Sequence, residues 1–116
     1  MQIHFLGKTF TIDWLAGFSN SSAQYLEASY NDLLIFKWNG SHNLYLLRDR
    51  KAFDNCDFSG AHFAGDRSPI KARLLGEPPI MYYLACNEPG DCVAGQKLAV
   101  STGDIKFENI RIYQGW

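Results

Sequence analysis

The chain has 116 residues, 47% of them hydrophobic and 20% charged, and a formal net charge of -1. This length and composition predict one globular domain with a single core. The balanced charge excludes the basic surface that nucleic acid or an anionic membrane would attract. No apolar run approaches the roughly 20 residues that a membrane-spanning helix needs.

The first half of the chain predicts short β-strands separated by polar turns, at 3–5, 9–14, 33–38 and 44–47. The segment 23–29 fits either one helical turn or a strand. The run 33–38 is almost entirely apolar, which predicts a strand that is buried on both sides or bent between two sheets. The Asn39-Gly40 pair that follows is the short-range signal of a β-hairpin.

The second half predicts further strands at 70–75, 80–85, 98–100 and, as a last alternating segment, 105–113. A short helical turn is expected at 52–56, followed by a polar loop at 57–68 that carries His62. Two prolines exclude helix at the turn 76–79. Many short strands with turn signals at this spacing predict an all-β protein, an antiparallel sandwich or barrel.

The stretch 81–97 carries the chemistry of the chain. An apolar run brings Cys86 to its end, a tight polar turn follows at 87–91, and Cys92 comes before the next apolar run. A thiolate on a loop between two strands is held rigidly, as a metal site requires. The stretch therefore predicts a metal site at one end of a β-sandwich core.

The order and spacing of several short motifs resemble those of the phytocyanins, the plant-type blue copper proteins of the cupredoxin fold. The matching motifs are at 31–36, 42–44, 53–58, 82–86 and 92–98. The last two are the most specific, because they combine a cysteine with Cys-x-x-Gly-Gln-Lys-Leu. The resemblance implies a Greek-key β-sandwich with one disulfide, a family-like core at about 3–101, and an extra C-terminal strand or tail at 102–116.

The resemblance also implies a mononuclear copper site. His42 would be a nitrogen ligand, Cys86 the thiolate ligand, and Gln96 the weak axial ligand of the stellacyanin-like branch. The second histidine of the family should stand just before the disulfide cysteine, where this sequence has Asp91. By itself, an aspartate at this place is equally well a turn residue that binds its own backbone.

If Asp91 is a ligand, the chemistry of the site changes in a predictable direction. A blue copper centre uses two imidazoles and one thiolate, with a long, weak axial contact. A carboxylate is a harder, anionic ligand that favours Cu(II) over Cu(I). We therefore expect a lower reduction potential than that of a two-histidine site, and an altered or absent thiolate-to-copper absorption band.

Three alternatives remain open for this site. A set of histidine, cysteine and aspartate also suits Zn(II). The site could instead hold no metal, as in the early-nodulin-like relatives of the phytocyanins, which serve at the cell surface without copper. His62 could supply the missing imidazole, although nothing in its spacing favours this.

The three cysteines suggest one pair and one separate thiol. The resemblance implies that Cys56 and Cys92 form the disulfide, which leaves Cys86 for the metal. A rival reading places all three cysteines and a histidine around a structural zinc ion. The gap between Cys86 and Cys92 is wider than in common zinc knuckles, which disfavours that reading.

The family resemblance implies a secreted or cell-surface protein, a monomer that exchanges electrons with a redox protein or a small molecule. The start of the chain lacks the pattern of a signal peptide, so we expect that a leader has been removed. Two Asn-x-Ser sequons make Asn20 and Asn39 candidate glycosylation sites. No residue set suggests hydrolysis, so we do not expect an enzyme.

Overall fold

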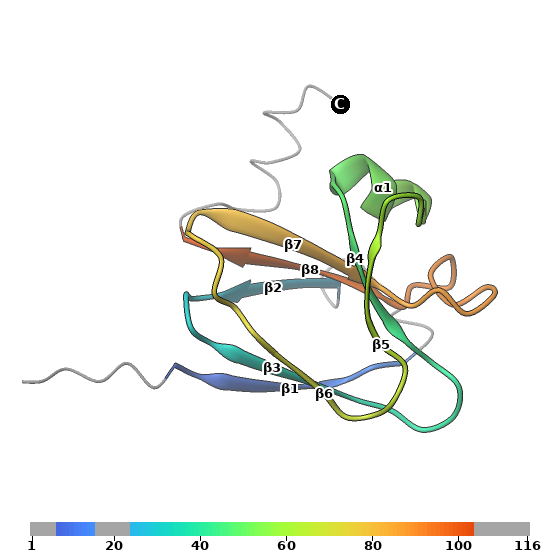
Figure 1. Cartoon of the computed structure of the whole chain (residues 1–116), viewed down its shortest axis with the longest axis horizontal. Helices are drawn as coiled ribbons and strands as arrows, with labels where there is room; N and C mark the ends of the chain where they lie inside the picture. The colour runs from blue at the N-terminus through green and yellow to red at the C-terminus, as the bar shows by residue number, and fades with distance from the viewer. Residues whose placement is uncertain (1–6, 16–23, 104–116) are drawn as a thin grey trace, which may run out of the picture.

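The computed structural model describes residues 7–15 and 24–103, which form a β-sandwich with one short helix (Figure 1). The predicted strands at 3–5 and 105–113, and the sequon at Asn20, lie outside the described residues. The elements are β1 (Thr9–Asp13), β2 (Tyr25–Ala28), β3 (Leu33–Lys37), β4 (Leu44–Leu47), α1 (Arg50–Asn55), β5 (His62–Gly65), β6 (Ile70–Arg73), β7 (Ile80–Ala85) and β8 (Lys97–Thr102).

The strands form two sheets, with the orders β1-β3-β6 and β2-β8-β7-β4-β5. The predicted all-β sandwich is therefore confirmed. It is not purely antiparallel, because β1 pairs with β3 and β2 pairs with β8 in parallel. The ambiguous segment 23–29 contains the strand β2. Since β8 ends at Thr102, the predicted tail at 102–116 lies almost entirely outside the described residues.

The predicted hairpin at Asn39-Gly40 is wrong. β3 pairs with β1 and β6, whereas β4 belongs to the other sheet and pairs with β5 and β7. Both edges of β3 are already occupied, so the chain after Gly40 crosses to the second sheet instead of folding back. Gly40 has a φ of 84°, which a residue without a side chain adopts easily. This crossing brings His42 to one end of the sandwich.

Between β4 and β6 the chain forms the helix α1 and the edge strand β5. The helix α1 begins where the Asp49 carboxylate accepts a hydrogen bond from the Ala52 amide at 2.8 Å, and it ends at Cys56. The predicted helical turn at 52–56 is confirmed, although it begins earlier. The strand β5 falls within the predicted polar loop and forms an exposed edge of the second sheet. No helix in the described part is long and apolar enough to cross a membrane.

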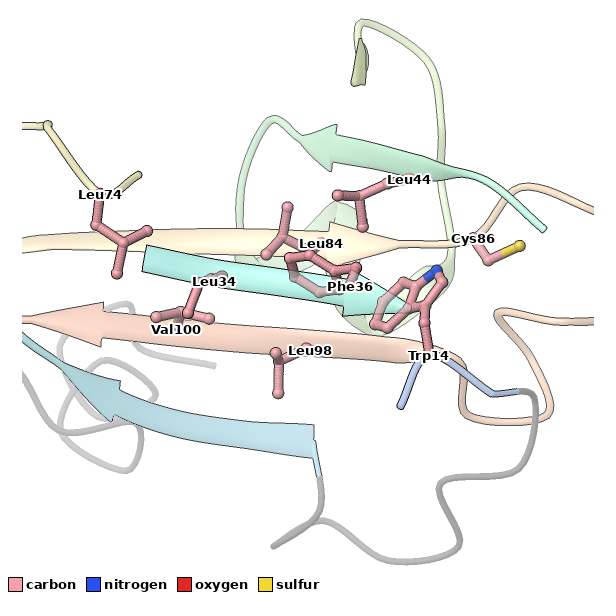
Figure 2. Close-up of a cluster of buried hydrophobic side chains, with 9 residues drawn as sticks. All are labelled: Trp14, Leu34, Phe36, Leu44, Leu74, Leu84, Cys86, Leu98 and Val100. Carbon is pink, nitrogen blue, oxygen red and sulfur yellow. The ribbon is translucent and has the colours of Figure 1, made fainter. Parts of the chain in front are cut away.

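The main core fills the space between the two sheets (Figure 2). Its buried members are Trp14, Leu34, Phe36, Leu44, Leu74, Leu84, Cys86, Leu98 and Val100. Figure 2 shows Cys86 and Trp14 at one end of this cluster and Leu74 at the other. The free thiol therefore lies at one end of the sandwich core.

Candidate metal centre

Cys86 follows the last residue of β7 and is completely buried. Its backbone amide donates to the Gln96 carbonyl at 3.1 Å, and its Sγ accepts a hydrogen bond from the Asn43 amide at 3.4 Å. Burial raises the pKa of the Cys86 thiol, and the neighbouring Asp91 carboxylate adds to this increase. Backbone amides partly offset the increase, because they stabilise the thiolate.

His42 reaches the same place from the loop that crosses between the sheets. Its Nδ1 lies 2.8 Å from Asp91 Oδ2 and 3.9 Å from Cys86 Sγ. The Cys86 thiol donates to the same carboxylate oxygen at 3.3 Å. The ligand atoms of the three residues all lie within 4.8 Å of one another. The side chains of His42 and Asp91 are 20% and 18% exposed, so the group lies just below the surface.

Asp91 lies in the turn between β7 and β8. Its backbone amide donates to the Glu88 carbonyl at 3.0 Å, which makes it part of the turn. Its side chain, however, contacts His42 and Cys86, and these are not the local backbone contacts that a simple turn-forming aspartate would make. Asp91 therefore has both the turn position and the orientation that a ligand would need.

Gln96 is fully buried, and its main chain contacts two of these residues, Cys86 and Asp91. Its carbonyl accepts from the Cys86 amide, and its amide donates to the Asp91 carbonyl at 2.9 Å. Within the described residues, neither polar atom of its side-chain amide has a hydrogen-bond partner. A buried polar group without a partner is costly, so this residue needs another partner such as a metal ion. Nitrogen, sulfur and oxygen donors with an additional amide suit copper or zinc.

The disulfide supports the loop that carries Asp91. Cys56 and Cys92 are bonded, with their Cα atoms 5.9 Å apart, and Cys86 remains the free, buried thiol. The predicted pairing is confirmed. The rival zinc site built from all three cysteines is wrong, because two of the thiols are used in the disulfide.

His62 does not join the candidate ligands. It lies on the edge strand β5, where it is exposed and pairs with Leu46 of β4. Among the described residues, the group with metal-ligand geometry contains His42, Cys86 and Asp91 only. The suggestion that His62 supplies the missing imidazole therefore gains no support.

Sequence reasoning gave no role to Asn43, which holds the site together. Besides its amide contact with Cys86, its side-chain Oδ1 accepts a hydrogen bond from the Asn87 amide at 2.6 Å. Asn43 thus connects the loop of His42 to the loop of Asp91. Its place between His42 and a strand was the only available signal, because the partners lie more than forty residues away.

No family model and no curated protein sequence matches the chain. Solved structures do match it. Spinach plantacyanin is 21% identical, with a TM-score of 0.63, over 82% of this chain and 99% of that one. Cucumber stellacyanin in a Cu²⁺ form is 22% identical, with a TM-score of 0.65, over 86% and 99%. The cucumber basic protein, a blue copper protein, is 28% identical, with a TM-score of 0.50, over 65% and 75%. These likenesses confirm the predicted fold.

Proposed function

Because the chain has the cupredoxin fold of the phytocyanins, we propose that it binds one copper ion and transfers electrons through it. In this proposal His42, Cys86 and Asp91 would hold the ion, and the buried side-chain amide of Gln96 would be a further, weaker ligand. The observation that carries the proposal is the convergence of three ligand atoms within 4.8 Å at one end of the core. Bound copper would supply one-electron chemistry.

The surrounding chain prepares this site for a soft metal ion. Cys86 must lose its proton to act as a ligand, and the Asn43 amide, 3.4 Å from Sγ, stabilises the resulting negative charge. The disulfide and the hydrogen bond from the Asn87 amide to Asn43 Oδ1 hold the loops of His42 and Asp91 in fixed positions. Such rigidity limits the rearrangement that accompanies a change of oxidation state.

Asp91 sets the character of the site in this proposal. Its carboxylate adds a negative charge beside Cys86 and replaces a neutral imidazole, so it favours Cu(II) over Cu(I). The reduction potential is therefore expected to be lower than in a variant with histidine at this position. The partner in electron transfer would be a redox protein or a small molecule, and the chain would act as a monomer.

Two other functions are favoured by specific observations. The donor set of nitrogen, sulfur and oxygen is equally acceptable to Zn(II). A domain without metal is favoured by the direct 2.8 Å contact between His42 Nδ1 and Asp91 Oδ2, which pairs the two side chains without an ion. In the latter case the protein would be a non-redox interaction domain at the cell surface.

Native mass spectrometry separates these functions. The purified protein would be dialysed against Cu(II), against Zn(II), and against both at equal concentration, then freed of excess metal. The proposed copper-binding function predicts one tightly bound copper ion in the competition experiment. One zinc ion there would favour the second function, and no bound metal in any sample would favour the third.

We also propose that the protein is secreted or displayed at the cell surface. Disulfides persist in oxidising compartments, and the sequon residue Asn39 is exposed in the turn after β3. Expression with a secretion leader in eukaryotic cells should add a glycan at Asn39 that peptide N-glycosidase removes. The Asn39→Gln variant should lose that mass difference. An unglycosylated Asn39 in secreted wild-type protein would refute Asn39 as a glycosylation site.

A further inference from the structure

Trp14 connects the smaller sheet to the metal-site end of the molecule. It follows β1, and its backbone amide donates to the Lys37 carbonyl at the end of β3, at 2.8 Å. Its side chain is completely buried and packs edge-on against Phe36, with ring centroids 5.1 Å apart. Figure 2 shows its indole nitrogen on the side of the ring that faces Cys86. The orientation of the indole is therefore fixed by both main chain and core.

The indole N–H of Trp14 donates to the Asn43 carbonyl at 2.8 Å. Asn43 follows His42 and is held at two further points. Its amide donates to Cys86 Sγ, and its side chain accepts from the Asn87 amide. Trp14 therefore adds a third contact to Asn43, which connects the loop of His42 to the loop of Asp91.

We infer that Trp14 is a positioning residue for the metal centre, an inference that rests on the proposed metal-binding function. The indole fixes the peptide that follows Asn43, and so fixes the direction of its amide toward Cys86 and the position of His42. Groups that orient metal ligands through hydrogen bonds commonly change metal affinity by 10- to 100-fold when they are removed. A purely structural tryptophan would lower stability without acting selectively on this loop.

The test removes the indole N–H and keeps the ring. Replacement of Trp14 by 3-benzothienylalanine puts sulfur in place of the N–H with nearly the same shape, and Trp14→Phe is a simpler second variant. The matched control is Leu74→Val, a change at the opposite end of the same buried cluster. Amide hydrogen exchange would be measured in the metal-free protein, and the absorption spectrum in the copper-loaded protein.

Both Trp14 variants are expected to speed exchange of the Asn43 amide about tenfold, as loss of one hydrogen bond would allow. The copper-loaded forms should also show a shifted thiolate-to-copper band. Leu74→Val should change neither. If the Asn43 amide exchanges at the wild-type rate in both Trp14 variants, the inference is overturned. A wild-type protein that binds no metal would overturn the proposed function, whereas faster Asn43 exchange would still support the positioning of this loop by Trp14.

Discussion

Nδ1 of His42 lies 2.8 Å from Oδ2 of Asp91, although the two residues are 49 positions apart in the sequence. The contact brings together the loop that crosses between the sheets and the loop that joins β7 to β8. Cys86 lies beside both residues. A carboxylate therefore occupies the side of the site where the phytocyanin resemblance implies a second imidazole. The first prediction depends on this difference.

Asp91→His is expected to raise the reduction potential of the copper-loaded protein. The change removes a negative charge and a hard oxygen ligand, so Cu(I) becomes relatively more stable. The thiolate-to-copper band should become more intense. Voltammetry and visible spectroscopy of both proteins measure these effects. Asp66→Asn, on the exposed loop after β5, serves as the control for loss of one negative charge. Identical potentials and spectra for wild type and Asp91→His would exclude Asp91 as a ligand.

Gln96→Leu is expected to stabilise the metal-free protein and weaken metal binding. The wild-type side chain is fully buried, and its amide atoms have no hydrogen-bond partner within the described residues. Replacing it with an apolar side chain of similar size removes a penalty of about 1–3 kcal/mol. Urea unfolding of the two metal-free proteins measures this difference. A destabilised variant would show that the amide is satisfied in solution.

Loss of the disulfide is expected to lower stability by about 4 kcal/mol, because the bond closes a loop with a sequence separation of 36. This corresponds to a decrease in melting temperature on the order of 10 °C or more. Calorimetry of the Cys56→Ala/Cys92→Ala double variant measures it. Reduced wild-type protein should melt at the same temperature as the variant, and an unchanged melting temperature in both would contradict the expected contribution.

The interactions of Asp57 are expected to make the protein lose stability in acid. Hydrogen bonds from the Ser59 amide and hydroxyl, together with Arg48, lower the pKa of this carboxyl to about 2. Its unfolded pKa is about 3.9, so the interaction stabilises the protein above about pH 4 and is lost as the pH falls towards 2. The melting temperature of Asp57→Asn should decrease less than that of wild type over this range. Equal decreases would show that Asp57 does not contribute.

Local patterns predicted most strands and several contacts of the site. The apolar run at 80–85 is the strand β7, and the cysteine at its end lies at one end of the core as expected. The resemblance gave the disulfide between Cys56 and Cys92 correctly. These features follow from periodicity within short segments or from an unusual spacing of residues, and both are visible in a linear sequence.

Long-range pairing accounts for what could not be predicted. The Asn39-Gly40 signal is local, whereas the choice of sheet depends on β1 and β6, which occupy both edges of β3. The strand β5 was missed because an exposed edge has no apolar alternation. The roles of Trp14 and Asn43 depend on contacts between residues 29 to 44 positions apart. Such contacts appear only when the chain is folded.

The absorption spectrum of the copper-loaded protein, compared with that of Cys86→Ser, tests the central claim most directly. A thiolate ligand to Cu(II) predicts one bound copper ion in the wild type, with sulfur-to-copper charge-transfer absorption that is altered by Asp91 and that Cys86→Ser lacks. If wild-type protein binds one copper ion and its spectrum is the same as that of Cys86→Ser, the buried sulfur is not a ligand and the proposed copper centre is contradicted.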